Sequence, residues 1–131
     1  MKKEIIKTDA APAPIGPYNQ AIRVGDLIYC SGQIPLDPKS GTVIGEGNVE
    51  VQTQQVMKNI EAVLNGGGLS IKNVVKTTIF LKSMGDFPKV NAIYGEYFPK
   101  DAPARSCVEV ARLPKDVLVE IEVIAYDDHK K

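Results

Sequence analysis

The sequence has few of the residues on which most metal and nucleophilic chemistry depends. Its 131 residues include one histidine, two cysteines and no tryptophan. The histidine, His129, lies in the charged tail after Tyr126, which excludes a histidine-based metal cluster and argues against a Ser-His or Cys-His nucleophilic pair. Cys30 and Cys107 both fall in strand-like runs, and so small a number of thiols gives no reason to predict a disulfide in a cytoplasmic protein.

The chain also lacks an excess of charge of either sign and any long apolar run. Lysine plus arginine and aspartate plus glutamate number 16 each, which gives no support to nucleic-acid or membrane-surface binding through bulk charge. The basic start, residues 1–7, lacks the apolar core of a signal peptide, and no run approaches transmembrane length. We therefore expect a cytoplasmic protein without a membrane partner. With 44% hydrophobic and 24% charged residues, residues 1–131 are predicted to form a single globular domain.

The most regular pattern lies in residues 102–126, where two runs alternate apolar and polar side chains. Such alternation places successive side chains on opposite faces of a strand, and the short connection predicts that the two strands pair as a hairpin. Arg105 and Cys107 share one face of the first strand, and Glu120 and Glu122 share the mixed face of the second. Charged groups and a thiol on an apolar hairpin are costly unless they meet a partner or a ligand. The hairpin is therefore predicted to carry an anion-binding and water-activating site.

Two interpretations of Arg105 stay open from the residues alone. It forms a salt bridge to Glu120 or Glu122 across the hairpin, or its planar fork of donors binds a substrate carboxylate at two points. Glu120 is correspondingly a counter-ion or a general base that deprotonates a water, and Glu122 can serve in either role. Cys107 is as well explained by core packing, and without a nearby histidine it is a poor nucleophile.

The remaining patterns predict the element order β, β, β, α, β, α, β, β. Alternating or β-branched runs predict strands at residues 4–8, 18–24, 27–31 and 74–81, and apolar residues at helical spacing predict helices at 48–66 and 86–98. Asn48 is the expected N-cap of the first helix, and the three glycines at 66–68 terminate it rather than cradle a phosphate, because they follow the helix. This order predicts an α+β fold with both helices packed on one face of a mixed sheet. The apolar residues of the other face predict burial against further subunits.

Four other residues are candidates for the site. Asn91 is a polar amide in an aromatic helix face. Either it bonds a backbone group or lies at the edge of that face, or it reaches a ligand or a neighbouring subunit. Tyr18, at a predicted strand end, has the character of a surface or interface residue. Ser31 beside Gly32 permits close approach of backbone to a ligand, although a turn alone also explains the pair.

Four segments, in order along nearly the whole chain, resemble one known family. They are IGPYNQAIRVGDLIYCSGQIPLDP, VMKNIEAVLNGGG, VNAIYGEYFP and APARSCVEVARLPKDVLVEIEVIAY. On these segments the chain resembles the RidA/YjgF/YER057c/UK114 family of reactive-intermediate deaminases. The resemblance implies a chorismate-mutase-like α+β fold, assembled as a homotrimer with sites in the clefts between subunits.

The resemblance also implies an activity, the hydrolysis of enamines and imines to 2-oxo acids and ammonia. The typical substrates are 2-aminoacrylate with its imine 2-iminopropanoate, and 2-iminobutanoate. The family's site residues fall on Tyr18, Ser31, Gly32, Asn91, Arg105, Cys107 and Glu120. Arg105 would bind the substrate carboxylate and Glu120 would place a water against the imine carbon, with the other five shaping the pocket. No metal or organic cofactor is implied, because an iminium carbon is already electrophilic.

Two other function classes compete with this one. The first is a ligand-sensing module that binds small 2-oxo or amino acids without turnover. The second, which the family resemblance suggests, is RNA cleavage or translation inhibition; the balanced charge and the single histidine of the tail oppose it.

Overall fold

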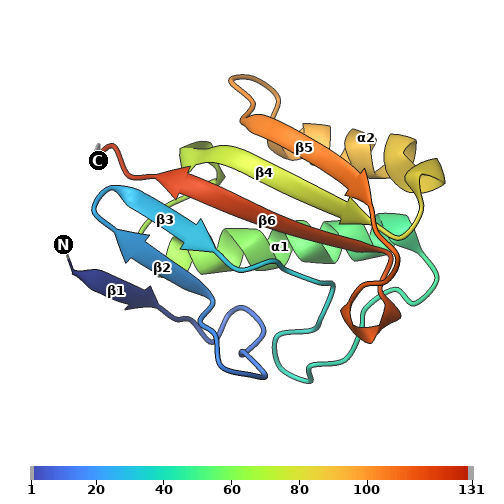
Figure 1. Ribbon diagram of the computed structural model, residues 1–131, viewed down its shortest axis with the longest axis horizontal. Helices are drawn as coiled ribbons and strands as arrows, with labels where there is room; N and C mark the ends of the chain where they lie inside the picture. The colour runs from blue at the N-terminus through green and yellow to red at the C-terminus, as the bar shows by residue number, and fades with distance from the viewer. Residues whose placement is uncertain (1, 130–131) are drawn as a thin grey trace.

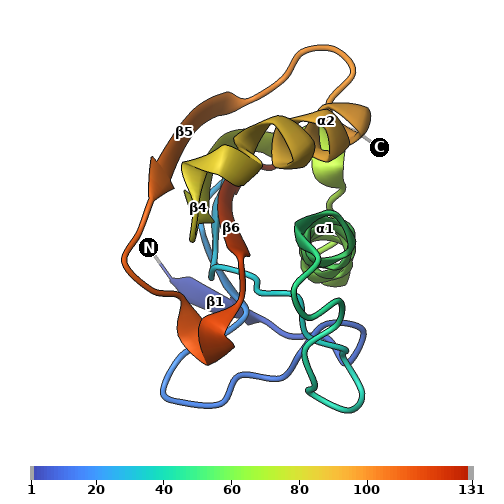
Figure 2. The same ribbon diagram turned by 90° about the vertical axis from the view of Figure 1, so that its right-hand side faces the viewer.

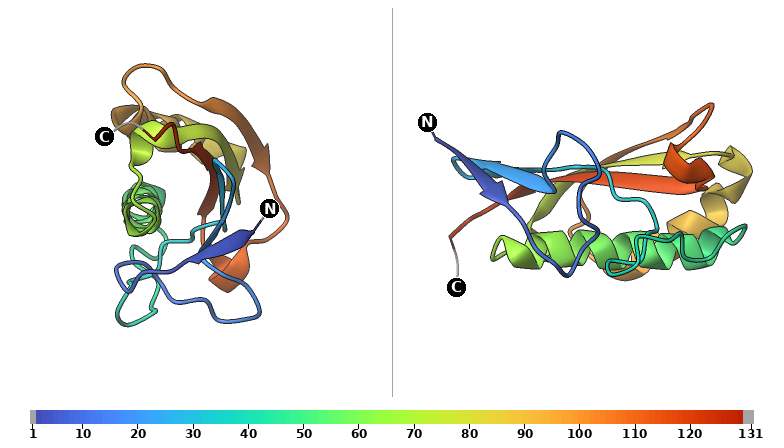
Figure 3. Two further views of the ribbon diagram at one scale, coloured as in Figure 1. Left: turned by 90° about the vertical axis from the view of Figure 1, so that its left-hand side faces the viewer. Right: turned by 90° about the horizontal axis from the view of Figure 1, so that it is seen from below.

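A mixed six-stranded sheet and two helices make up the computed structural model, which describes residues 2–129 (Figure 1). The strands are β1 Lys3–Ile6, β2 Ala21–Val24, β3 Leu27–Cys30, β4 Val74–Leu81, β5 Ala104–Glu109 and β6 Val119–Tyr126. The helices are α1 Val49–Gly66 and α2 Phe87–Tyr97. Both helices lie on the same side of the sheet, so that the molecule has two layers (Figures 2 and 3). The expected α+β arrangement is confirmed.

The strand order is β1-β2-β3-β6-β4-β5, and every neighbouring pair is antiparallel except β4 with β5. The parallel pair arises because α2 carries the chain from the end of β4 back to the start of β5, as a parallel pairing requires. The predicted hairpin of residues 102–126 is wrong, because β4 lies between β5 and β6. Residues 110–118 join two strands that never pair with each other.

Helix α1 begins and ends where its local sequence predicts. The Asn48 side-chain oxygen accepts a hydrogen bond from the Val51 amide at 3.0 Å, so it satisfies one of the free amides of the first turn. At the other end Gly68 adopts a φ of +78°, which L side chains rarely adopt. Its amide bonds the Asn65 carbonyl at 3.0 Å, and the Leu69 amide bonds the Leu64 carbonyl at 2.9 Å.

The core lies between the helices and one face of the sheet. In the two eight-residue strands, the buried residues that face the helices alternate with less buried ones: Val74, Thr77, Ile79 and Leu81 in β4, and Val119, Ile121, Val123 and Ala125 in β6. Burial of each such Leu, Ile or Val contributes about 1.5–3 kcal/mol. The alternate residues of β6, Glu120 and Glu122 among them, therefore lie on the face that no helix covers.

The loop before β2 extends further along the chain than the sequence predicted. Residues 9–17 are irregular as expected, but β2 starts at Ala21 and not at Tyr18. The Gln20 side chain explains the difference, because it turns inward and bonds the loop. Its Oε1 accepts from the Thr8 amide at 2.7 Å, and its Nε2 donates to the Pro12 carbonyl at 2.9 Å.

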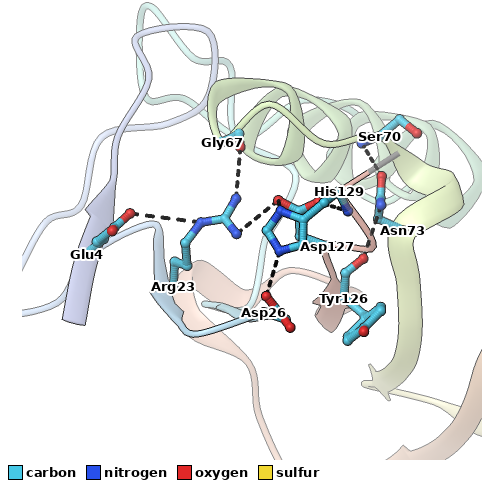
Figure 4. A network of polar contacts seen from close by, with 9 residues as sticks. All are labelled: Glu4, Arg23, Asp26, Gly67, Ser70, Asn73, Tyr126, Asp127 and His129. Carbon is cyan, nitrogen blue, oxygen red and sulfur yellow. Dashed lines mark hydrogen bonds and ion pairs between the residues drawn. The ribbon is translucent and has the colours of Figure 1, made fainter. Parts of the chain in front are cut away.

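A polar network joins the end of β6 to β2 and to the end of α1 (Figure 4). The Arg23 guanidinium pairs with Asp127 at 3.0 Å and reaches the Gly67 carbonyl at 3.4 Å. The His129 ring lies 2.7 Å from an Asp26 carboxylate oxygen, and this hydrogen bond is the main cause that raises the pKa of His129. The one histidine of the chain thus serves to hold the C-terminal segment against the β2–β3 turn.

Candidate active site

The seven predicted site residues fall into two clusters, one associated with each face of the sheet. The first, here called the Glu120 pocket, is lined in part by Tyr18, Ser31, Gly32 and Glu120. The second, here called the Arg105 cluster, consists of Asn91, Arg105 and Cys107. The alternation of strand side chains separates them. Glu120 of β6 points away from the helices, whereas Arg105 of β5 is in register with the buried Thr77 and lies against α2.

The Glu120 pocket has a volume of about 450 Å³. Its wall is formed by the loop before β2, the segment after β3, the turn before β6 and the start of β6. The lining residues are Pro12, Ala13, Ile15, Tyr18, Gln20, Ser31, Gly32, Gln33, Ile34, Leu36, Pro114, Lys115 and Glu120. Most of them are apolar or small, and such a lining suits a small organic ligand.

Glu120 is the half-buried carboxylate of this pocket. Burial raises its pKa above the ordinary value for a glutamate, and the neighbouring negative charge of Glu122 raises it further. Among residues 2–129 it has no hydrogen bond and no ion pair. Gly32 makes room for it, because a Cβ at position 32 would overlap the Glu120 carboxylate. The pocket thus holds one carboxylate with free acceptor positions.

The other two predicted members lie at the edge of the pocket. The Ser31 hydroxyl donates to the Asn19 carbonyl at 2.6 Å, and the Ser31 amide donates to the Gln20 carbonyl at 2.9 Å. Ser31 therefore closes the loop onto the end of β3 as well as lining the pocket. Tyr18 is 50% exposed, at the pocket wall formed by the proline-rich loop.

The sequence interpretation missed Lys115 as a pocket residue. It lies in the 3-10 turn Pro114–Asp116, where Lys115 and Asp116 both have a φ of +56°. The signal that could have found it is the sequence Leu-Pro-Lys-Asp directly before the strand that carries Glu120. A polar turn of this kind next to a site strand often supplies side chains to the site.

Arg105 has three close partners, and none is a carboxylate. Its Nη1 donates to the Asn91 side-chain oxygen at 2.7 Å. Its Cζ lies 5.4 Å from the centre of the Phe87 ring and 5.0 Å from that of Tyr94. The alternative of a salt bridge to Glu120 or Glu122 is wrong, because those carboxylates lie on the other face with β4 between them and β5.

Asn91 therefore bonds the arginine side chain rather than a backbone group. Within residues 2–129 the positive charge of Arg105 has no ion pair. An amide acceptor leaves the guanidinium with its full charge and with further N–H donors. Those donors are suited to an incoming carboxylate or phosphate.

Cys107 follows Arg105 by two residues on the same face of β5. Burial raises the pKa of its thiol more than the nearby Arg105 charge lowers it. Burial also raises the pKa of Cys30 to about 12. Both cysteines are free, and both are protonated near neutral pH, so neither is an activated nucleophile.

Together the two clusters can perform anion binding and general-base chemistry, but not on the same ligand within one chain. The reason is that Arg105 and Glu120 point to opposite faces of the sheet. Among residues 2–129 no three histidine, cysteine, aspartate or glutamate side chains come together as a metal site would require. In the same range no helix has the length and apolarity of a membrane span.

This geometry defines an α+β protein with an arginine that has no carboxylate partner among residues 2–129 on one face of its sheet, and a half-buried carboxylate in a pocket on the other face. A family model described as Endoribonuclease L-PSP matches residues 8–127. A RutC family protein of Synechocystis is 62% identical over 95% of this chain and 97% of its own length. The chain therefore belongs to the RidA/YjgF family, which carries that description.

Two further relatives bear on the chemistry. A Salmonella typhimurium protein named 2-iminobutanoate/2-iminopropanoate deaminase is 50% identical over 92% of this chain and 94% of its own length. The crystal structure of E. coli TdcF with bound serine has a TM-score of 0.90 and 40% identity, covering 95% of this chain and 99% of that chain. These likenesses confirm the family that the four sequence segments indicated, and with it the fold.

Proposed function

We propose that the protein is a 2-imino acid deaminase, which hydrolyses 2-iminopropanoate and 2-iminobutanoate, with their enamine forms, to 2-oxo acids and ammonia. The observation that carries the proposal is the Arg105 guanidinium, held in place by Asn91 and two rings yet without a carboxylate counter-ion among residues 2–129. The 50% identical deaminase of Salmonella typhimurium supports the same substrate class.

We further propose that the protein acts as a homotrimer with its sites between subunits. Arg105 of one protomer would face the Glu120 pocket of the next, since the two half-sites of one chain point to opposite faces. Burying the uncovered face of the sheet would also cover Leu27, Tyr29 and Tyr126, which are exposed apolar side chains of β3 and β6. Light scattering should give three times the chain mass of 14.2 kDa.

In the proposed reaction the substrate carboxylate binds to the free N–H donors of Arg105. Glu120 accepts a proton from a water while the oxygen of that water adds to the iminium carbon. A C–O bond forms and the C=N π bond breaks. The resulting carbinolamine takes that proton from Glu120 on its nitrogen. Its C–N bond then breaks and ammonia leaves, while the hydroxyl proton passes to Glu120 and the C=O bond forms. A carboxylate with a raised pKa suits both proton transfers, because its pKa lies closer to the pH at which the protein works.

The test is Arg105→Ala in an assay that generates the imine with a threonine or serine dehydratase and follows its decay. Loss of a charge-assisted carboxylate contact costs about 2–4 kcal/mol, so kcat/KM should fall about 30- to 700-fold. Arg112→Ala is the matched control, since it removes an exposed arginine whose partner Asp116 belongs to neither cluster. Full activity in Arg105→Ala, with a native circular dichroism spectrum, would refute the proposal.

The second candidate is a sensor that binds small amino or 2-oxo acids without turnover. The bound serine of TdcF, a relative 40% identical in sequence, favours it. The same assay separates the two candidates. A sensor binds 2-oxobutanoate in a calorimeter but leaves imine decay and ammonia release unchanged.

A further inference from the structure

The Arg105 side chain is exposed, yet three residues of α2 contact its guanidinium. Exposed arginines ordinarily sample many rotamers, and that freedom is lost when they bind a ligand. Here the guanidinium lies within cation–π distance of two rings of α2, those of Phe87 and Tyr94. Asn91, on the same helix, receives one of its N–H groups.

Tyr94 is itself held in place by burial and by a hydrogen bond to the sheet. Its ring is only 5% exposed, and its hydroxyl lies 2.8 Å from the hydroxyl of Thr77, which is 1% exposed. Thr77 belongs to β4, the strand that pairs with the strand of Arg105, and the two residues are in register. The chain of contacts therefore runs from the sheet core through one ring to the guanidinium.

We propose that Phe87, Tyr94 and Thr77 are positioning residues that hold the Arg105 guanidinium in a carboxylate-binding orientation. This inference rests on the function proposed above, and it assigns these three residues a role in that function. Aromatic faces stabilise a cation without using its N–H donors, and they carry no charge that would compete with an anion. A carboxylate in the same place would hold Arg105 equally well but would block the site.

The inference predicts a particular kinetic pattern. The substrate carboxylate contacts Arg105 both in the bound ground state and in the transition state. A more mobile Arg105 therefore weakens binding in both states by a similar amount. Such uniform loss raises KM and leaves kcat nearly unchanged. A variant that merely lost folded protein would lower apparent kcat at constant KM.

The experiment compares Tyr94→Leu, Tyr94→Phe and Thr77→Val with Tyr97→Leu as the control. Tyr97 lies on the same helix, and its hydroxyl contacts Gln54 at 3.4 Å, so it tests loss of an α2 tyrosine away from Arg105. Tyr94→Leu should raise both KM and the Kd of 2-oxobutanoate about tenfold, with kcat within about twofold. Tyr94→Phe and Thr77→Val keep the ring or the packing, and each should raise the same Kd about two- to threefold.

A second measurement follows Arg105 directly. Its Nε–H resonance, assigned by its loss in Arg105→Lys, should show a rigid side chain in the free wild-type protein and a mobile one in Thr77→Val and Tyr94→Leu. This measurement needs no turnover, and the mild Thr77→Val variant keeps the test valid if Tyr94→Leu fails to fold.

The outcomes separate this inference from the proposed function. Unchanged Kd and unchanged Nε–H relaxation in the Tyr94 and Thr77 variants, while Arg105→Ala loses 2-oxobutanoate binding, would overturn the positioning role alone. Wild-type binding in Arg105→Ala would overturn the proposed function and the positioning role together. Raised Kd with a mobile guanidinium in the Tyr94 and Thr77 variants would establish the positioning role, whereas the proposed function is established by imine decay that is lost in Arg105→Ala.

Discussion

Replacing Gly32 by alanine tests whether the placement of the Glu120 carboxylate determines the rate. The backbone of Gly32 lies outside the left-handed region, so alanine is acceptable there by its dihedral angles. The new methyl group, however, would overlap Oε2 of Glu120 and lie 3.0 Å from its Cδ and 3.2 Å from its Cγ. The three atoms nearest to the new methyl group all belong to Glu120, so we expect the substitution to act mainly on that side chain.

The magnitudes separate stability from activity. The overlapping atom is the end of a flexible side chain, so Glu120 can swing aside at about 0.5–1.5 kcal/mol, the cost of an unfavourable rotamer. That swing moves the carboxylate by roughly 1 Å, and a misplacement of that size lowers the rate about a hundredfold. We expect a folded protein whose kcat/KM is reduced about a hundredfold.

The assay is imine decay in the coupled dehydratase reaction, alongside urea unfolding of each variant. Gly95→Ala is the control, because a Cβ there meets nothing within 4 Å and a mid-helix alanine stabilises by about 0.5–1 kcal/mol. It should unfold at higher urea and keep full activity. Wild-type kcat/KM in Gly32→Ala would show that the position of Glu120 does not limit the reaction.

Two further predictions concern pH and stability. Since the pKa of Glu120 is raised by burial and then by the charge of Glu122, activity should fall with decreasing pH already above the usual range of a glutamate. Glu122→Gln removes the second cause, lowers the pKa of Glu120, and should shift this acid limb of the kcat/KM profile to lower pH; an unshifted limb would contradict it. Gln52 is 2% exposed and its Oε1 accepts from the Leu118 amide at 2.8 Å, so Gln52→Leu should cost about 1–3 kcal/mol in urea unfolding. The partly buried Gln54 accepts only a longer bond from the Tyr97 hydroxyl at 3.4 Å, so Gln54→Leu should cost less.

Local patterns predicted most of the elements because the forces that form them are local. Helix α1 starts at the Asn48 cap and ends at its glycines, since capping and positive φ depend on a few neighbouring residues. The faces of β6 were also predicted, because the pleat alternates whatever strand lies alongside. The start of β2 was not, because the Gln20 side chain bonds a segment about ten residues away.

Local sequence patterns did not predict which strands lie next to each other in the sheet. Consecutive strands usually pair, so residues 102–126 indicated a hairpin. In the structure β6 lies between β3 and β4, and β5 pairs with β4 through the crossover that contains α2. In this arrangement β6, whose apolar face is buried, lies between two strands that are distant from it in sequence. Local sequence patterns carry no information on such distant neighbours.

The sequence by itself determined the family and, through it, the candidate site residues: an arginine, a carboxylate and a set of small or polar residues. Only the tertiary structure decided that Arg105 and Glu120 point to opposite faces, that Asn91 and two rings rather than a carboxylate hold the arginine, and that Gly32 leaves space for Glu120. The physical reason is that side-chain partners are set by sheet order and helix packing, and both join residues distant in sequence.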